Sequence, residues 1–288
     1  MTLFLKALQG LFRAFFWLPG NWPLINIWSG SWIIAQLLKH TKTKKSVTKN
    51  INLLLPNIKA SKAADKLLTN TCFGVFELLS LPYFRPGHWQ KSIKLCGLEN
   101  VATAFSGGRG VIILTIHAGN YELIPMTLAH HGYKMNTVLR ADDHPVFQLL
   151  NKSRSVGGVQ LINTLKEDMY KSSIDALAKN DGVFLLADTG ALESRHETVE
   201  FLGHRVPVAT GWLALAQRTG CAVVPTIAYK NGKQNLITLH PPIRVSKENR
   251  DQVKLEVLRL FEQHIQANPE QWGLFLNAFE TKRVAGKA

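Results

Sequence analysis

The chain has 288 residues, of which 46% are hydrophobic and 19% are charged, and its formal net charge is +14. A chain this apolar buries enough surface to offset its ordering entropy, which excludes an intrinsically disordered protein, and its length suits one large domain or two small ones. Its three cysteines, Cys72, Cys96 and Cys221, are too few and too widely spaced for a disulfide scaffold or a metal knuckle. We therefore expect reduced thiols in a protein that faces the cytosol.

The positive charge is concentrated in the N-terminal third. Residues 1–99 hold 13 basic and 3 acidic side chains, a balance of +10, whereas residues 100–288 hold 21 and 17, a balance of +4. The basic residues flank an uncharged segment, residues 14–38, which contains four of the seven tryptophans. Nucleic-acid-binding proteins usually mix basic and aromatic residues on one surface. Their separation here argues against a nucleic-acid partner.

The uncharged segment predicts membrane association. Its 25 residues exceed the about 20 that cross a bilayer as a helix, but Pro19, Gly20, Asn21 and Pro23 interrupt it. Tryptophan is enriched at the headgroup interface. Basic residues follow the segment at Lys39, Lys42, Lys44, Lys45 and Lys49. We expect a monotopic or re-entrant anchor whose basic flank lies on anionic headgroups, with a single transmembrane helix or an ordinary buried helical hairpin as the alternatives.

Helical spacing of apolar residues follows between Ser46 and Leu81, with a break at Pro56. Pro82 and the Pro86-Gly87 pair then end the helical region.

Short apolar runs alternate with helical segments after Gly97. The runs, which we expect to be strands, are residues 111–116, 136–139, 159–162, 183–187, 222–227 and 236–239. The helical segments are residues 122–130, 146–154, 165–179, 212–218 and, as a last amphipathic helix, 251–266. Several runs are apolar on both faces, which is typical of buried parallel strands. The pattern predicts an α/β fold with a central mixed sheet flanked by helices.

These features suggest two parts that pack as one unit. Residues 1–45 are the expected membrane-associating segment with its basic flank. Residues 46–288 are the expected catalytic domain, with a helical lead-in over 46–96 and an α/β core over 97–288.

Polar residues gather where the first core strand ends, at His117-Ala118-Gly119-Asn120-Tyr121-Glu122. On one continuous helix His117 and Glu122 would point about 140° apart, so they can meet only if His117 ends the strand and Glu122 begins the next helix. A carboxylate beside an imidazole fixes the tautomer of the ring and stabilises the imidazolium. The chain has no Gly-x-Ser-x-Gly elbow and no cysteine near this strand end. We therefore expect His117 to act as a general base on a substrate hydroxyl, unless it is a structural histidine.

The same residues resemble the lysophospholipid acyltransferase superfamily, in the form found in bacterial lipid A biosynthesis (late) acyltransferases. His-x-Gly-Asn-aromatic-Glu is similar to the family's motif of a histidine and an acid separated by four residues. Blocks similar in order and spacing follow at Val138-Leu139-Arg140, His144-Pro145, Phe147, Arg154, Gly157-Gly158, Leu185-Leu186-Ala187-Asp188, Glu200-Phe201-Leu202-Gly203, Thr210-Gly211, Ala222-Val223-Val224-Pro225 and Asn268-Pro269-Glu270-Gln271-Trp272. The resemblance covers residues 40–275.

The resemblance implies a membrane-associated O-acyltransferase in which His117 is the general base and Glu122 is its partner. Arg154 and Arg140 would bind phosphate or steady the oxyanion. Asp188 also ends an apolar strand, where a carboxylate needs a partner, and it could pair with either arginine.

Further site residues follow from the same resemblance. Gly119 and Asn120 would belong to the substrate or oxyanion site, and Gly203, Thr210 and Gly211 would shape the pocket wall.

The implied donor is an acyl thioester of acyl carrier protein or of CoA, and the implied acceptor is a lipid A precursor or a related glycolipid or hydroxylated lipid. The chain departs from the family at Thr189-Gly190 and over residues 274–279, which bears on the acceptor. No cofactor or metal is expected, because nucleotide-binding loops and the His-Glu-x-x-His motif are missing from the sequence. The implied location is the cytoplasmic face of the bacterial inner membrane, with an anionic membrane surface as partner.

Two other functions fit the residues. The first is a thioesterase or other hydrolase in which the same base activates water. The second is a non-enzymatic protein that binds membrane surfaces or nucleic acid, in which His117 is structural.

Overall fold

The structure is a computed structural model that describes residues 22–83, 90–141, 143–188, 196–277, 281, 282 and 284. An eight-stranded sheet has the order β1-β9-β8-β2-β5-β3-β4, with β10 paired to β8, and β6 and β7 form a separate hairpin. The strands are β1 (Ile93–Cys96), β2 (Val111–Thr115), β3 (Met135–Leu139), β4 (Gln160–Asn163), β5 (Gly182–Leu186), β6 (His196–Phe201), β7 (His204–Ala209), β8 (Ala222–Asn231), β9 (Gln234–Leu239) and β10 (Ile243–Arg244).

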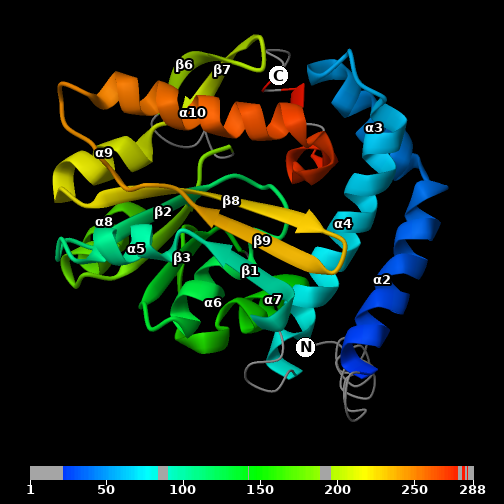
Figure 1. Ribbon diagram of the computed structural model, residues 1–288, viewed down its shortest axis with the longest axis horizontal. Helices are drawn as coiled ribbons and strands as arrows, with labels where there is room; N and C mark the ends of the chain where they lie inside the picture. Colours follow the sequence, from blue (N-terminus) through cyan, green and yellow to red (C-terminus); the bar gives the residue numbers. More distant parts are fainter. Residues whose placement is uncertain are drawn as a thin grey trace.

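Helices cover both faces of this sheet (Figure 1). The α-helices are α2 (Trp22–Lys39), α3 (Lys42–Leu54), α4 (Ala60–Ser80), α5 (Leu98–Phe105), α6 (Leu123–His130), α7 (Pro145–Arg154), α8 (Met169–Ala178), α9 (Gly211–Thr219) and α10 (Arg250–Ala267). The short 3-10 helices are η1 (Leu81–Tyr83), η2 (Gln90–Ser92), η3 (Val156–Gly158), η4 (Pro269–Gln271) and η5 (Gly273–Leu276). The α/β fold with a mixed central sheet, predicted from the sequence, is confirmed.

Strand β2 is the centre of the sheet, and all five of its residues are buried. It pairs in parallel with β5 on one side and with β8 on the other. Its alternate residues point to opposite faces: Ile112 and Leu114 pack with α8, α9 and α10, and Val111 and Ile113 pack with α5 and α6. Two hydrophobic cores, one on each face, therefore fix the strand that leads to His117.

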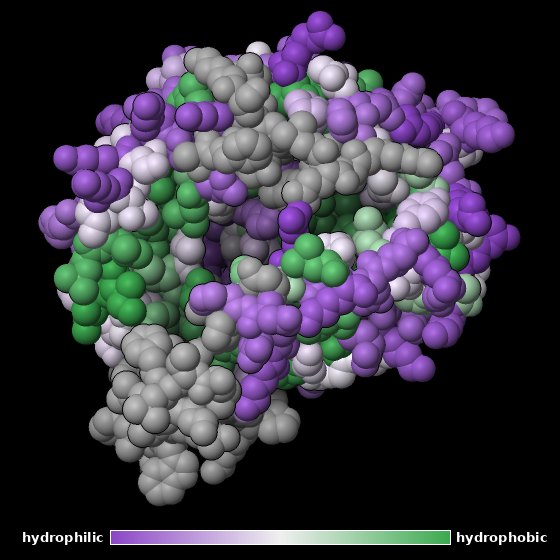
Figure 2. Space-filling view, turned by 180° about the vertical axis from the view of Figure 1, so that it is seen from behind, coloured by the Kyte–Doolittle hydropathy of each residue, from purple (hydrophilic) through white to green (hydrophobic). Residues whose placement is uncertain are grey.

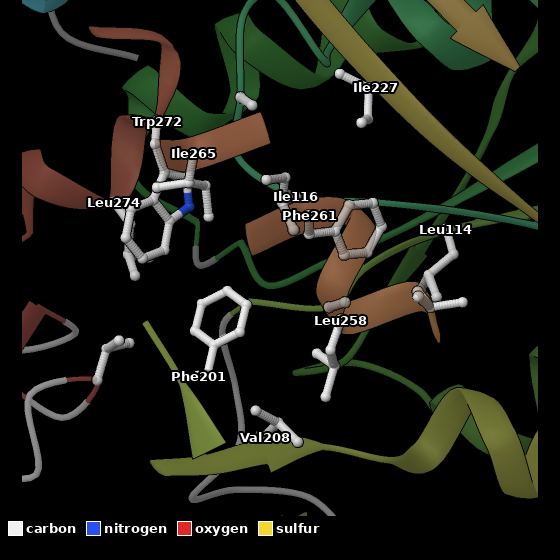
Figure 3. Close-up of a cluster of buried hydrophobic side chains, with 14 of the residues drawn as sticks. Leu114, Ile116, Phe201, Val208, Ile227, Leu258, Phe261, Ile265, Trp272 and Leu274 are labelled. Atoms are coloured by element: carbon white, nitrogen blue, oxygen red, sulfur yellow. The ribbon is translucent and has the colours of Figure 1, made fainter. Parts of the chain in front are cut away.

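Aromatic side chains fill the core between β2 and α10 (Figure 3). Trp272 meets Phe275 edge to face at 5.0 Å between ring centroids, and Phe201 of β6 lies 6.4 Å from Trp272. Burial of such large apolar side chains stabilises the fold by roughly 1.5–3 kcal/mol each.

Four strands were not predicted from the sequence: β1, β6, β7 and β10. The hairpin strand β6 reads His-Glu-Thr-Val-Glu-Phe, and its burial alternates along the strand, so it lacks the continuous apolar run of the central strands. Helix α8 begins at Met169, four residues later than predicted. The reason is a cap, because the side chain of Asp168 accepts hydrogen bonds from the backbone N–H of Tyr170 and Lys171.

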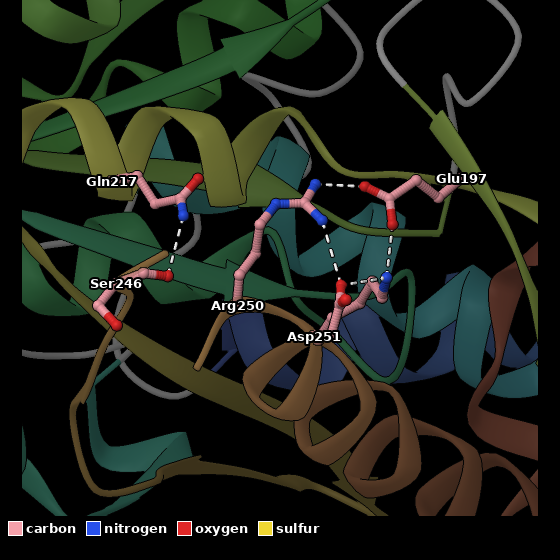
Figure 4. Close-up of polar contacts among 6 residues, drawn as sticks. Glu197, Gln217, Ser246, Arg250 and Asp251 are labelled. Carbon is pink, nitrogen blue, oxygen red and sulfur yellow. Dashed lines mark hydrogen bonds and ion pairs between the residues drawn. The ribbon is translucent and has the colours of Figure 1, made fainter. Parts of the chain in front are cut away.

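A network of ion pairs attaches the hairpin to α10 (Figure 4). Glu197 of β6 contacts the guanidinium of Arg250 and lies 2.5 Å from Nζ of Lys254. The hydrogen bond from Arg250, followed by that from Lys254, lowers the pKa of Glu197 to about 2. The network therefore holds β6, the strand that carries Phe201, against the first turns of α10.

The N-terminal helices pack on the edge of the sheet where β2 and β8 end. In Figure 1 the arrowhead of β8 points at α4, and α2 runs along the outer side of α4. The predicted break at Pro56 lies between α3 and α4. Val47 and Ile51 of α3 belong to the same core as Phe261 of α10. The helical lead-in therefore shares the core of the catalytic part.

The predicted membrane anchor falls partly within α2. Its residues 14–21 lie outside the described residues, and α2 begins at Trp22 with Pro23 in its first turn, where proline is tolerated. Within the described part of the chain, no helix combines the length and the hydropathy that crossing a bilayer requires.

Candidate active site

His117 and Asp188 meet because of the register between two parallel strands. Thr115, the last residue of β2, is paired with Leu186, the last residue of β5, and the chain runs two residues beyond each strand to reach His117 and Asp188. Equal offsets from one paired position bring the two side chains to the same place at the carboxyl end of the sheet. Ligand sites of open α/β sheets form at this edge.

Asp188 binds His117 through both of its carboxylate oxygens. Oδ1 lies 2.8 Å from Nδ1 of His117, and Oδ2 accepts a hydrogen bond of 2.9 Å from the His117 backbone N–H. Oδ2 also accepts a hydrogen bond of 2.8 Å from Nε1 of Trp272. The side chain of Asp188 is 3% exposed, and that of His117 is 23% exposed. The carboxylate is thus buried while the imidazole reaches the surface.

These contacts keep Asp188 ionised. Burial raises the pKa of Asp188, but the charge of His117 and the hydrogen bonds from His117 and Trp272 outweigh it, and the net pKa lies below its usual value. An ionised carboxylate accepts a hydrogen bond from Nδ1–H of the imidazole, which leaves the lone pair of the neutral ring on Nε2. The pair therefore has the form of a general base held by a carboxylate.

The turn after β2 is tightly constrained. Gly119 has a φ of +58°, and a Cβ atom there would lie 2.4 Å from the carbonyl oxygen of Ala228 in β8. The backbone N–H of Gly119 donates to the carbonyl of Gln271 at 2.9 Å, and the N–H of Gly273 donates to the carbonyl of His117 at 2.6 Å. Glycine at position 119 thus permits both the turn and its close approach to β8.

Glu122, the predicted partner of His117, binds Arg154 instead. Arg154 donates to it from Nε at 2.9 Å and from Nη2 at 2.5 Å, and both side chains are mostly buried. A third hydrogen bond of Arg154, 3.1 Å long, goes to Oδ1 of Asn151. Asp188, for which an arginine partner was expected, contacts His117 and Trp272. The acid nearest to His117 in the chain was predicted to be its partner. The register between β2 and β5 instead brings the distant Asp188 to His117.

Tyr121 lies between these two pairs. Its ring meets the ring of His117 edge to face, with 4.9 Å between the centroids. Burial, followed by the charge of Glu122, raises the pKa of the Tyr121 phenol well above its usual value, so the hydroxyl stays protonated.

The remaining predicted site residues lie elsewhere. Asn120 is 5% exposed, and its amide donates to Glu77 of α4. Arg140 is exposed just after β3. Gly203 lies in the β6–β7 turn with a φ of +73°. Thr210 and Gly211 form the start of α9. The last three therefore have local roles in a turn and a helix start, and the roles of the predicted residues in binding or catalysis stay predictions.

An apolar pocket opens beside the carboxylate. Asp188 and Trp272 line one part of it, and the remainder is lined by Ile116, Ala187, Phe201, Val206, Val208, Leu258, Phe261 and Val284. Its free volume is only about 10 Å³, and Figure 3 shows Phe201, Val208, Phe261 and Trp272 among the side chains that line it. The pocket lies where the ends of β2 and β5 meet the hairpin and α10.

Sequence reasoning gave no role to Trp272, Glu77 or Lys230. Trp272 was part of the resemblance, but only the folded chain places its N–H on Asp188. Lys230 ends an apolar strand, and Glu77 is an acid within an apolar helical stretch. Isolated charges in such segments are the signal that could have identified the pair. Among the described residues, no cluster of His, Cys, Asp and Glu side chains is arranged to hold a metal ion.

Comparison with known proteins gives this chain relatives and a family. Two phosphatidylinositol mannoside acyltransferases of Mycobacterium tuberculosis, strains CDC 1551 and H37Rv, are each 23% identical over 179 residues, 61% of this chain and 56% of the relative. The corresponding protein of Mycolicibacterium smegmatis is 20% identical over 199 residues, 68% of this chain and 65% of the relative. The chain thus aligns with less than two thirds of each relative's length.

A family model covers far more of the chain. The model described as bacterial lipid A biosynthesis acyltransferase matches residues 10–281, a range that includes His117, Asp188 and Trp272. The chain therefore belongs to the bacterial lipid A biosynthesis acyltransferase family.

Proposed function

We propose that the protein transfers a fatty acyl group from an acyl thioester to a hydroxyl of a glycolipid. The observation that carries this proposal is the buried Asp188 carboxylate on Nδ1 of His117, at the carboxyl end of β2, in a chain of this family. A general base is the group that an alcohol needs when it attacks an acyl carbonyl, and it contributes about 10²–10⁴-fold to the rate.

The proposed reaction is a direct transfer. Nε2 of His117 takes the hydroxyl proton while the alcohol oxygen bonds to the carbonyl carbon of the thioester. Asp188 stabilises the imidazolium that forms. The tetrahedral intermediate then breaks its carbon–sulfur bond, and the imidazolium gives its proton to the departing sulfur. The products are the ester and the free thiol.

Two neighbouring features suit the substrates. The apolar side chains that line the pocket beside Asp188 and Trp272 are the proposed contact for part of the acyl chain, which would enter only as they move apart. Arg154 already makes three hydrogen bonds within the protein, two of them to Glu122. Arg140 is exposed whereas Arg154 is mostly buried, so Arg140 is the proposed contact for an acceptor phosphate.

We further propose that α2 lies on an anionic membrane surface. Its large apolar side chains Trp32, Ile33 and Leu37 are 56%, 53% and 64% exposed. A groove beside its end is lined by basic residues, which are Lys39, His40, Lys44, Lys45 and Lys49. Figure 2 shows the apolar patch at the edge of the molecule next to hydrophilic surface. Apolar insertion and basic contacts together give stable binding to anionic lipid.

The acceptor class follows from the relatives. They are named phosphatidylinositol mannoside acyltransferases, and the family is named for lipid A biosynthesis, so both names point to a glycolipid. The donor is proposed to be an acyl thioester of CoA or of acyl carrier protein, and the basic surface suits either acidic partner.

A direct assay tests the proposal. Purified protein is incubated with palmitoyl-CoA or palmitoyl-acyl carrier protein and with a mannosylated phosphatidylinositol or a lipid A precursor, and the lipids are analysed by mass spectrometry. We expect an acylated glycolipid, and we expect His117→Ala to lower its rate of formation by at least about 10²-fold.

Other outcomes separate the alternatives. Release of free fatty acid at a rate independent of the acceptor would identify a hydrolase. Transfer at the wild-type rate by His117→Ala would refute the mechanism.

A further inference from the structure

A buried ion pair lies behind the turn that carries His117. Glu77 of α4 contacts Nζ of Lys230 of β8, and the side chains are 12% and 1% exposed. Asn235 of β9 donates to both carboxylate oxygens of Glu77, at 3.3 and 3.2 Å. Asn120 completes the cluster by donating from Nδ2 to Oε2 of Glu77 at 2.8 Å. The cluster joins α4, two strands and the turn.

Burying this ion pair costs the desolvation free energy of both charges. Burial lowers the pKa of Lys230, and the charge and hydrogen bond of Glu77 oppose that shift. A buried ion pair contributes little net stability compared with apolar residues of the same volume, so its presence is better explained by the geometry it imposes. Here that geometry includes the carboxylate that receives the amide of Asn120.

The turn is connected to Lys230 by a second route. The Gln271 side chain accepts from the Lys230 backbone N–H at 2.9 Å and donates to its carbonyl at 3.0 Å. The backbone carbonyl of Gln271 accepts from Gly119. Asn120 also packs against Gly74 of α4, where an added Cβ would lie 3.5 Å from its Cγ. The turn is therefore held through Asn120 on one side and through Gly119 on the other.

We infer that Glu77 is a positioning residue for the acyl-transfer site, and that it acts through Asn120. Its carboxylate holds the 117–120 turn in the conformation in which Nδ1 of His117 meets Asp188. This inference rests on the proposed function, because it takes His117 as the base. It also gives Asn120, predicted from the sequence to bind substrate, a different role: its amide points to α4.

The clearest test removes the link and leaves the ion pair intact. Asn120→Ala deletes the hydrogen bond to Glu77 and keeps Glu77, Lys230 and Asn235. The matched control is Asn136→Ala, which removes another buried amide, 8% exposed, that donates to the carbonyl of Gly182 at the opposite edge of the sheet. Both variants lose one buried hydrogen bond, and so both should lose similar thermal stability.

Kinetics and NMR separate positioning from stability. With the donor and acceptor pair of the assay above, we expect Asn120→Ala to lower kcat by about 10- to 100-fold with little change in KM, because misplacing a catalytic group by about 1 Å can cost 10²-fold. Asn136→Ala should keep the wild-type kcat. The downfield proton resonance of Nδ1 of His117, assigned by its loss in Asp188→Asn, should weaken or shift in Asn120→Ala and stay unchanged in Asn136→Ala.

A second variant tests Glu77 itself. Glu77→Leu removes the carboxylate that accepts from Asn120, but alone it leaves a buried lysine charge, so it is combined with Lys230→Met, which removes both charges. We expect the double variant to fold and to show the low kcat of Asn120→Ala, and adding Asn120→Ala to it should lower kcat little further.

Failure of this inference can be distinguished from failure of the proposed function. A wild-type kcat and an unchanged Nδ1 resonance in Asn120→Ala would overturn the inference. If the wild-type protein forms no acylated lipid, the proposed function fails, and the Nδ1 resonance still decides whether Asn120 and Glu77 position the histidine.

Discussion

The carboxylate that matters most at the scale of single residues is Asp188. It is 3% exposed and is held by both the His117 backbone and Trp272, so it fixes the imidazole rather than moving with it. We expect Asp188→Asn to lower kcat by about 10²- to 10⁴-fold, because an amide neither stabilises the imidazolium nor enforces the tautomer with its lone pair on Nε2. Initial rates of glycolipid acylation measure the effect.

The control for this prediction is Asp175→Asn, which neutralises an exposed carboxylate on α8. It should retain the wild-type rate. If Asp188→Asn were as active as Asp175→Asn, the carboxylate would have no part in catalysis.

The sequence predicted His117 but not its partner, and the reason is physical. The position of His117 follows from local information, since an apolar run ends at a polar turn. The partner depends on the register between β2 and β5, whose paired residues Thr115 and Leu186 are far apart in the chain. Two positions beyond this pair each segment has an ionisable residue, His117 after β2 and Asp188 after β5. With the register known, Asp188 could have been predicted.

At the level of secondary-structure elements, helix α10 carries a buried titratable group that bears on stability. His264 faces the apolar side of the helix near Tyr229, and its Nε2 has no hydrogen-bond partner within the described residues. Burial, followed by the charge of His240, lowers its pKa to about 4. The folded protein therefore keeps His264 neutral at pH values where the unfolded chain protonates it.

The protein should accordingly lose stability as the pH falls from about 6.5 towards 4. One pKa unit corresponds to about 1.4 kcal/mol, so His264 accounts for at most about 3.5 kcal/mol of this loss. We expect His264→Phe to reduce the fall in Tm between pH 7 and pH 5, measured by thermal denaturation. His131→Phe, at an exposed position, should leave the fall as it is in the wild type. An equally steep fall in His264→Phe would contradict the assignment.

The burial pattern of each strand explains whether it could be predicted from the sequence. Strands buried on both faces, such as β2, have continuous apolar runs and were found. Strands such as β6 alternate between exposed and buried residues and carry charges, and the ion pairs of Glu197 with Arg250 and Lys254 that hold β6 form only in the folded chain. The order of strands depends on contacts between distant segments, which a single sequence does not encode locally.

At the scale of the whole molecule, the N-terminal helices connect the proposed membrane surface to the catalytic edge of the sheet. Helix α2 packs along α4, and α4 carries Glu77, which binds the turn of His117 through Asn120. This arrangement places the helical lead-in, which was expected to belong to the catalytic domain, next to the turn of the proposed base. The proposed membrane surface and the proposed base are thus linked by one helix.

The last prediction concerns membrane binding by α2. Trp32 and Leu37 are 56% and 64% exposed, and transferring such side chains from water to lipid contributes roughly 1.5–3 kcal/mol each. Trp32→Ser with Leu37→Ser should therefore weaken binding to phosphatidylglycerol vesicles by at least about tenfold in co-sedimentation. The matched control, Leu165→Ser with Leu255→Ser, replaces leucines that are 50% and 43% exposed but lie away from α2, and it should bind like the wild type.

Salt and lipid charge test the basic component of the same surface. Because Lys39, Lys45 and Lys49 border the apolar face, binding of the wild type should weaken in phosphatidylcholine vesicles and at high salt. The Trp32→Ser, Leu37→Ser variant should keep this dependence on charge while its overall affinity falls. Equal affinity of that variant and the Leu165→Ser, Leu255→Ser control would show that α2 is not the surface that meets the membrane.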